Sequence, residues 1–222
     1  MDWLNFALAL AAFFASHWIP ARPGVKRAMQ ARLGPRLYAA VFGLVSLAVL
    51  AWVIVAAGRA PYVTIWEQYP WMRWAANIIM PLAVALVVLA LGAPNPLSFG
   101  GRREGFDPLR PGLAGIMRHP LLWALFLWSA AHLLVNGDLA HVILFGIFAL
   151  FCLAGMGLLD KRRRRDLGAA EWQRLAAVSP NLPFARGLRR WHPPVWRLVL
   201  ALALWAGLIL AHPWVIGVSP LP

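Results

Sequence analysis

The chain is poor in carboxylates, in charged residues overall and in cysteine. Only 8 of its 222 residues are Asp or Glu, and charged residues make up 13% of the chain, whereas soluble domains carry about 25%. A single cysteine, Cys152, excludes a disulfide framework and a cysteine-based zinc site. These shortages exclude a soluble globular enzyme and leave few carboxylates or thiolates for a calcium or zinc site.

Hydrophobic residues are abundant and occur in long runs. They form 61% of the chain, and the mean hydropathy is +0.66. A transmembrane helix needs about 20 apolar residues to cross the hydrocarbon layer. We therefore predict an all-α polytopic membrane bundle of about six transmembrane helices, forming a single integral membrane domain over residues 1–222. The predicted spans are Trp3–Ile19, Leu37–Gly58, Trp74–Gly92, Leu121–Val135, Leu139–Leu159 and Leu198–Val218. Asp138 is predicted to cap the fifth span, and Gly100 and Gly101 are predicted to form a turn in the third connecting segment.

The basic residues are distributed unevenly between the spans. All 21 Lys and Arg residues except Arg59 and Arg73 fall in the first, third and fifth connecting segments or at their borders. The positive-inside rule then places these segments in the cytoplasm and both termini in the periplasm. The net charge of +13 is thus expected to face anionic lipid rather than nucleic acid. The predicted environment is the lipid bilayer of a bacterial cytoplasmic membrane.

Histidines inside membrane spans are costly and mark functional positions. His17 ends the first span, His119 precedes Pro120 at the start of the fourth, and His132 lies deep in that same helix. One interpretation is that these side chains only hydrogen-bond to neighbouring helices. The other is that two neutral imidazoles ligate a metal, best a haem iron, because two histidines with few acidic groups suit haem better than zinc or calcium.

Eight short stretches with recognisable motifs extend over nearly the whole chain. They are Ser16–His17 with Pro20–Arg22, Arg59–Val63, Ser98–Arg102, Arg110–Leu113, Arg118–Pro120, Ala131–His132, Asn136–Asp138 with His141, and Leu159–Arg163. These stretches resemble the NnrU proteins, which are bacterial multispanning membrane proteins associated with nitric oxide reduction in denitrifiers. The NnrU proteins are homologous to the plant 15-cis-zeta-carotene isomerase, which holds haem b between two histidines and isomerises a cis double bond when the iron is reduced.

The resemblance implies specific ligands. The isomerase's two haem ligands match His17 and His132, and its cysteine three residues before the second ligand is replaced here by Ser129. Depth in the membrane would instead pair His17 with His119, which we keep as a reserve ligand. Arg118 offers a fork of donors for a haem propionate. The expected activity, if the protein is an enzyme, is haem-dependent cis–trans isomerisation of a polyene, and a polyene or quinone is the expected hydrophobic ligand.

Two further hypotheses stay open. Arg118–Pro120 together with Glu171 resembles membrane methyltransferases that bind S-adenosylmethionine at the cytoplasmic face. Alternatively, the protein is a non-enzymatic assembly or regulatory factor for a membrane partner in nitric oxide metabolism, and its histidines serve packing only. A Soret band in the purified protein would separate the haem hypothesis from both.

Overall fold

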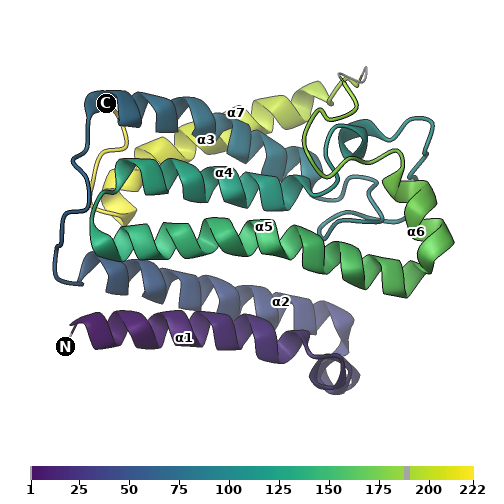
Figure 1. Ribbon diagram of the computed structural model, residues 1–222, viewed down its shortest axis with the longest axis horizontal. Helices are drawn as coiled ribbons and strands as arrows, with labels where there is room; N and C mark the ends of the chain where they lie inside the picture. Colours follow the sequence, from purple (N-terminus) through teal and green to yellow (C-terminus); the bar gives the residue numbers. More distant parts are fainter. Residues whose placement is uncertain (1, 188–190) are drawn as a thin grey trace. The chain divides into compact units, whose positions relative to one another are not determined.

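The structure is a computed structural model that describes residues 2–187 and 191–222, and in these ranges it is helical (Figure 1). Strand-like pairing is limited there to two isolated bridges, Thr64 with Asp138 and Pro94 with Arg102. The all-α prediction is confirmed. The helices are α1 (Asp2–Ala21), α2 (Pro23–Gly58), α3 (Pro70–Ala90), the 3-10 turn η1 (Gly112–Gly115), α4 (Pro120–Val135), α5 (Leu139–Leu167), α6 (Ala169–Ala176) and α7 (Val195–Val215).

Five helices, α1, α2, α3, α5 and α7, are long and apolar enough to cross a membrane. The polytopic helical membrane architecture is therefore confirmed, with one difference in detail. The predicted fourth span, α4, has 16 residues and is about 24 Å long at 1.5 Å per residue. It is shorter than the roughly 30 Å hydrocarbon layer, so neighbouring segments of the chain must satisfy the polar groups at its ends.

Two helices extend beyond their predicted spans. α2 begins at Pro23 rather than Leu37 and bends at Gly34, whose φ of 74° interrupts the helix just before Pro35. α5 continues past Leu159 to Leu167, because the basic run after Asp160 consists of good helix formers. Gly168, with φ of 82°, then breaks the helix and forms the N-cap of α6.

The chain divides into two compact units, and each is described by itself. The first comprises residues 1–67 and 137–144. In it α1 and α2 form a helical hairpin, in which Tyr38 donates a hydrogen bond to the carbonyl of Pro20 at 3.1 Å. The connection that follows α2 is held to the residues just before α5 by backbone hydrogen bonds from Ile65 and Trp66 to the carbonyl of Gly137, at 2.7 and 3.1 Å.

Two residues of this connection have clear structural roles. A Cβ atom at Gly137 would lie 1.8 Å from the Trp66 carbonyl oxygen, so only glycine fits there. The prediction that Asp138 caps α5 is confirmed, because its Oδ1 accepts the backbone N–H of His141 at 3.2 Å. The His141 ring also lies against this carboxylate, with Nδ1 2.7 Å from Oδ2. His141 is thus tied to the helix start.

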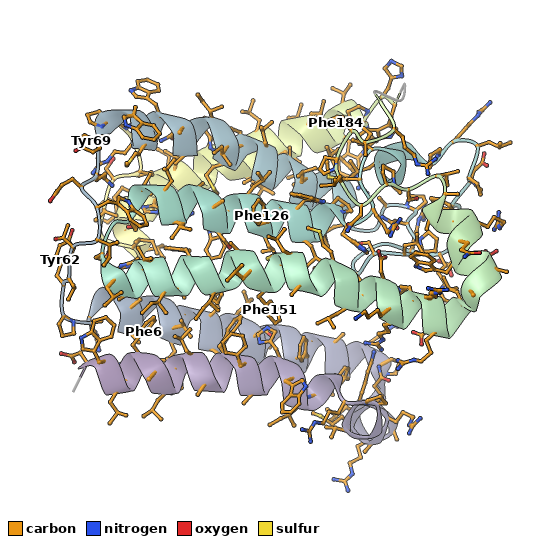
Figure 2. The ribbon with its side chains drawn as sticks, viewed as in Figure 1. Phe6, Tyr62, Tyr69, Phe126, Phe151 and Phe184 are labelled. Carbon is orange, nitrogen blue, oxygen red and sulfur yellow. The ribbon has the colours of Figure 1, made fainter. Side chains whose placement is uncertain are left out.

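The second unit comprises residues 68–136 and 145–222. In Figure 1, α4 lies between α3 and α5, and α7 packs against α3. Figure 2 shows that side chains along these helices are almost entirely carbon, as on the α4 face that carries Phe126, whereas nitrogen and oxygen gather around α6 and the adjoining loops. The unit therefore has an apolar helical body and one polar end.

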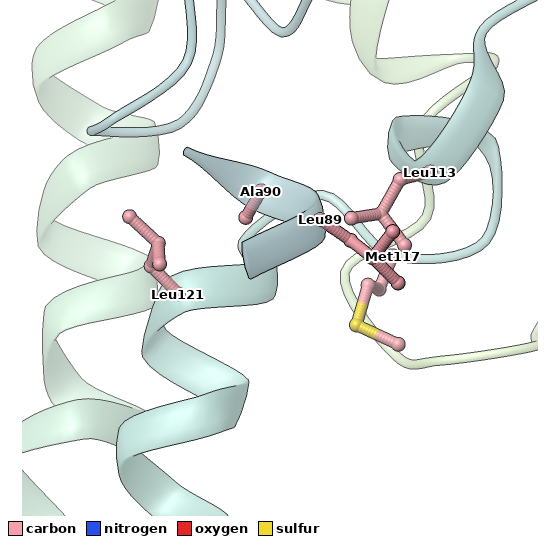
Figure 3. Close-up of a cluster of buried hydrophobic side chains, with 5 residues drawn as sticks. All are labelled: Leu89, Ala90, Leu113, Met117 and Leu121. Carbon is pink, nitrogen blue, oxygen red and sulfur yellow. The ribbon is translucent and has the colours of Figure 1, made fainter. Parts of the chain in front are cut away.

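An apolar cluster joins the helices of this unit to its polar end. Figure 3 shows five buried side chains where the end of α3, η1 and the start of α4 meet. They are Leu89, Ala90, Leu113, Met117 and Leu121. Arg197 at the start of α7 closes the α3 end by donating to the carbonyls of Val88 and Leu89 at 3.1 and 3.0 Å. The loop between α3 and α4, which carries polar residues of this end, is thus held where it leaves α3 and where it enters α4.

Candidate functional site

His132 lies in the last turn of α4 and has a fixed ring orientation. Its Nδ1 is 2.8 Å from the carbonyl oxygen of Trp128, one turn earlier. The ring packs against Trp128 and Phe145, with centroids 5.2 and 5.1 Å apart. A carbonyl oxygen only accepts hydrogen bonds, so Nδ1 carries a proton. In the neutral imidazole, the lone pair is then on Nε2.

His17 in α1 repeats this arrangement in the other unit. Its Nδ1 is 2.8 Å from the carbonyl oxygen of Phe13, again one turn earlier. Its ring packs against Phe13 and Phe42, with centroids 4.3 and 5.8 Å apart. Ser16 shares the same carbonyl at 2.9 Å and lies 3.2 Å from Nδ1. In the neutral form of this imidazole, the lone pair is therefore also on Nε2.

Each of the two histidines has a hydrogen bond of the kind that is common among metal-ligating histidines. Metal-ligating histidines typically donate their second ring N–H to a carbonyl or carboxylate, which sets the tautomer and raises ligand basicity. Both rings show this hydrogen bond, and both lie among aromatic side chains. Haem needs only two protein donors, and no group of three or more His, Cys, Asp or Glu side chains suited to an ion was found in the described residues.

Ser129 lies three residues before His132, where the resemblance to the isomerase leads one to expect a cysteine. It is fully buried in α4, and its hydroxyl donates to the carbonyl of Leu125 at 2.8 Å. A hydroxyl is a hard, weak ligand compared with a thiolate. The Ser129 side chain therefore does not support an exchange of ligands on a haem iron.

A second group of polar side chains, the Arg118–His119–Asp160 cluster, lies at the opposite end of α4. His119 is fully buried, and its Nε2 is 3.1 Å from Oδ1 of Asp160. Arg118 forms an ion pair with the other oxygen of the same carboxylate, and its Nε donates to the Ser179 carbonyl at 2.9 Å. A single acidic residue of α5 thus binds both side chains that precede α4.

The loop before η1 completes this cluster. The buried side chain of Asn95 donates to the Arg118 carbonyl at 2.8 Å, and its Oδ1 accepts the backbone N–H groups of Leu97 and Ser98 at 3.1 and 3.2 Å. A Cβ at Gly101 would lie 2.5 Å from the Asn95 carbonyl, so the predicted turn at Gly100 and Gly101 requires glycine there. The backbone N–H of Arg118 also donates to Pro180 at 2.7 Å.

The structure therefore separates the predicted site residues into distinct places. His119 and His132 are 13 residues apart on one helix, which is about 20 Å, and His17 belongs to the other unit. Arg118 donates to Asp160 and Ser179 within the chain. Its proposed role toward a haem propionate stays a prediction, as does the reserve role of His119.

Asp160 is the functional candidate that sequence reasoning missed. It stands within Leu159–Arg163, one of the stretches that resemble NnrU proteins, but it was given no role. A lone carboxylate that ends an apolar run and precedes five basic residues is a usable signal, because a membrane-border acid needs a cationic partner. The partner itself, 42 positions earlier, is not visible in the sequence.

Glu171, the acidic residue of the methyltransferase hypothesis, is engaged elsewhere. It accepts two hydrogen bonds from Arg174, both at 2.8 Å, and these hold the pKa of the Glu171 carboxyl below its usual value. A cavity of about 10 Å³ beside Asn95, Ser98 and Pro120 has room for about one water molecule. Neither feature favours an S-adenosylmethionine site.

The long apolar helices define a helical multi-pass membrane protein. The comparison with protein families goes further. The family model described as NnrU protein matches residues 5–220, so the chain belongs to the NnrU family. No curated protein and no solved structure matches the chain.

Proposed function

We propose that this NnrU-family protein binds haem b in the bacterial cytoplasmic membrane, with His17 and His132 as the two axial ligands. One observation carries the proposal: each of these rings donates Nδ1–H to the carbonyl oxygen one helical turn earlier, at 2.8 Å. The same tautomer is thereby set in both units. A bis-histidine haem supplies one-electron redox chemistry.

The chain's own residues orient the rings and keep their surroundings apolar. The carbonyls of Phe13 and Trp128 restrict ring rotation, and the hydrogen bonds increase the electron density at Nε2. Phe42 and Phe145 pack on the two rings and provide hydrophobic walls. Burial and low local polarity are among the features by which proteins tune the potential of a bound haem.

The biological role follows from the family and has two forms. In the first, the haem protein takes part in nitric oxide reduction with a membrane partner. In the second, it isomerises a polyene, as the isomerase related to this family does. Ser129 in place of a cysteine favours the first form, because the thiolate that would exchange on iron is missing. A quinone or polyene remains the hydrophobic molecule that we propose for either role.

An absorption spectrum tests the cofactor proposal. Protein purified in mild detergent from haem-replete cells should show a Soret band and, after reduction, the sharp bands of low-spin haem; a pyridine haemochrome assay should identify haem b. His17→Ala and His132→Ala should each remove or shift these bands. His212→Ala is the matched control, because its half-buried ring also contacts a carbonyl, that of Val218 at 2.7 Å. A colourless wild-type preparation would refute haem binding.

A complementation experiment separates the roles. Deletion should lower nitric oxide consumption by intact cells, and the wild-type gene should restore it while His17→Ala and His132→Ala do not. If all histidine variants restore activity, the protein is a non-enzymatic assembly factor. Incubation of the reduced and oxidised protein with a cis-polyene, followed by chromatography, tests isomerase activity directly.

A further inference from the structure

The contacts between α4 and α5 lie at two ends of the same pair of helices. At one end the His132 ring packs against Phe145. At the other end His119 contacts Asp160. The two contacts are separated by 13 residues on α4 and 15 on α5, which are about 20 and 22 Å. Because these lengths agree, antiparallel helices in a single register make both contacts.

The surface between these ends does not itself fix that register. Leu122 packs against Gly155, where even an added Cβ would find ordinary contact at 3.6 Å. Apolar side chains that slide past one another in lipid lose little, since lipid tails are as apolar as the neighbouring helix. A displacement by one helical turn, about 5.4 Å, would instead separate Asp160 from Arg118 and His119. Buried ionic contacts of this kind specify register elsewhere in helical proteins.

We infer that Asp160 is a positioning residue: by binding Arg118 and His119 it fixes the register of α4 on α5, and thereby the place of the His132 ring about 20 Å away. The inference rests on the proposed function only for the role of His132 as a haem ligand. The register itself is a property of the helix pair, and it can be measured without haem.

Cross-linking in the full-length protein tests the register. Trp128 and Phe148 stack with ring centroids 6.0 Å apart, and the native Cys152 lies one turn further along α5. A short reagent with two thiol-reactive groups, such as a bis-maleimide, should link Trp128→Cys to Phe148→Cys, in a Cys152→Ala background, faster than it links Trp128→Cys to native Cys152. We expect at least a tenfold preference, equivalent to about 1.4 kcal/mol. Asp160→Ala should abolish it, and Asp160→Glu should restore part of it.

Controls keep the result decisive. Asp166→Ala removes another carboxylate of α5, one that is exposed and only loosely paired with Arg162 at 3.7 Å, and it should leave the preference intact. The neutral pair Arg118→Gln with Asp160→Asn removes the ionic contact without leaving a buried unpaired charge. It should lose the preference even if Asp160→Ala does not accumulate. An unchanged preference in the neutral pair would overturn the inference.

The midpoint potential and the g values of the haem provide a second readout, which is independent of cross-linking. In protein with native Trp128, Phe148 and His132, Asp160→Asn should shift the midpoint potential and the low-spin g values of the haem. Asp160→Glu should recover part of the shift, and Asp166→Ala should cause none. A colourless wild type whose cross-linking still depends on Asp160 would refute the proposed function and uphold the register inference. Haem properties that do not respond to Asp160→Asn would overturn the link to His132.

Discussion

Asn95 holds the polar end of the second unit together, and its removal should destabilise the protein measurably. Its side chain is 4% exposed, donates to the Arg118 carbonyl and accepts from Leu97 and Ser98. Asn95→Ala leaves three buried backbone groups without this partner, and each such loss costs roughly 1–3 kcal/mol. Because the two amides share one oxygen, we expect a total of about 2–4 kcal/mol.

Unfolding in detergent provides the assay. Titration of dodecyl maltoside micelles with sodium dodecyl sulfate, followed by circular dichroism, gives the free energy of unfolding. A loss of 3 kcal/mol would also lower the thermal midpoint by roughly 6–12 °C for a chain of this size. Asn181→Ala, at an exposed position after the same cluster, should change stability by less than about 0.5 kcal/mol. An Asn95→Ala protein as stable as this control would refute the assigned hydrogen-bond role.

Three further predictions concern positions with distinct local roles. Gly137→Ala should severely destabilise the contact between this residue and the segment after α2, since its Cβ would lie 1.8 Å from the Trp66 carbonyl oxygen. Gly157→Ala, with nothing within 4 Å of its Cβ, should be neutral or stabilising. The purification yield and the unfolding midpoint of the two variants check both expectations. Arg197→Ala should cost about 1–3 kcal/mol, because carbonyls at the end of α3 lose a charged donor, and unaltered unfolding would contradict this. Ser129→Ala should cost less than about 1.5 kcal/mol and leave the haem spectrum unchanged, because the hydroxyl bonds only within its helix turn.

The sequence predicted well those features that depend on composition or on neighbouring residues. Long apolar runs are visible directly, so α1, α2, α3, α5 and α7 were anticipated. The Asp138 cap was anticipated for the same reason, since the capping residue adjoins its helix. The end of α5 was predicted too early because a change from apolar to basic residues marks the end of the apolar run but not the end of helical backbone. Lys and Arg continue a helix readily, and Gly168 ends it.

The ionic cluster could not be predicted because it depends on register. Arg118 and Asp160 are 42 positions apart, and no local pattern states which turn of α5 faces the start of α4. The ring orientation of His17 and His132 is a different case. It depends on the carbonyl four residues earlier, which a helical histidine can reach, so this hydrogen bond could have been predicted from the helix alone.

The short length of α4 and the burial of the Arg118–His119–Asp160 cluster have a common physical explanation. A helix end in lipid must have its backbone and charged groups satisfied by protein, and α4 is too short to bring both ends to water by itself. At its start, Pro120 removes one unsatisfied N–H, Asn95 binds the Arg118 carbonyl, and Asp160 neutralises the arginine. At this end of α4, polar groups of the protein thus supply the contacts that lipid headgroups and water supply to a longer helix. A helix that is anchored by protein rather than by lipid keeps one position, which is what the proposed role of His132 at its other end requires.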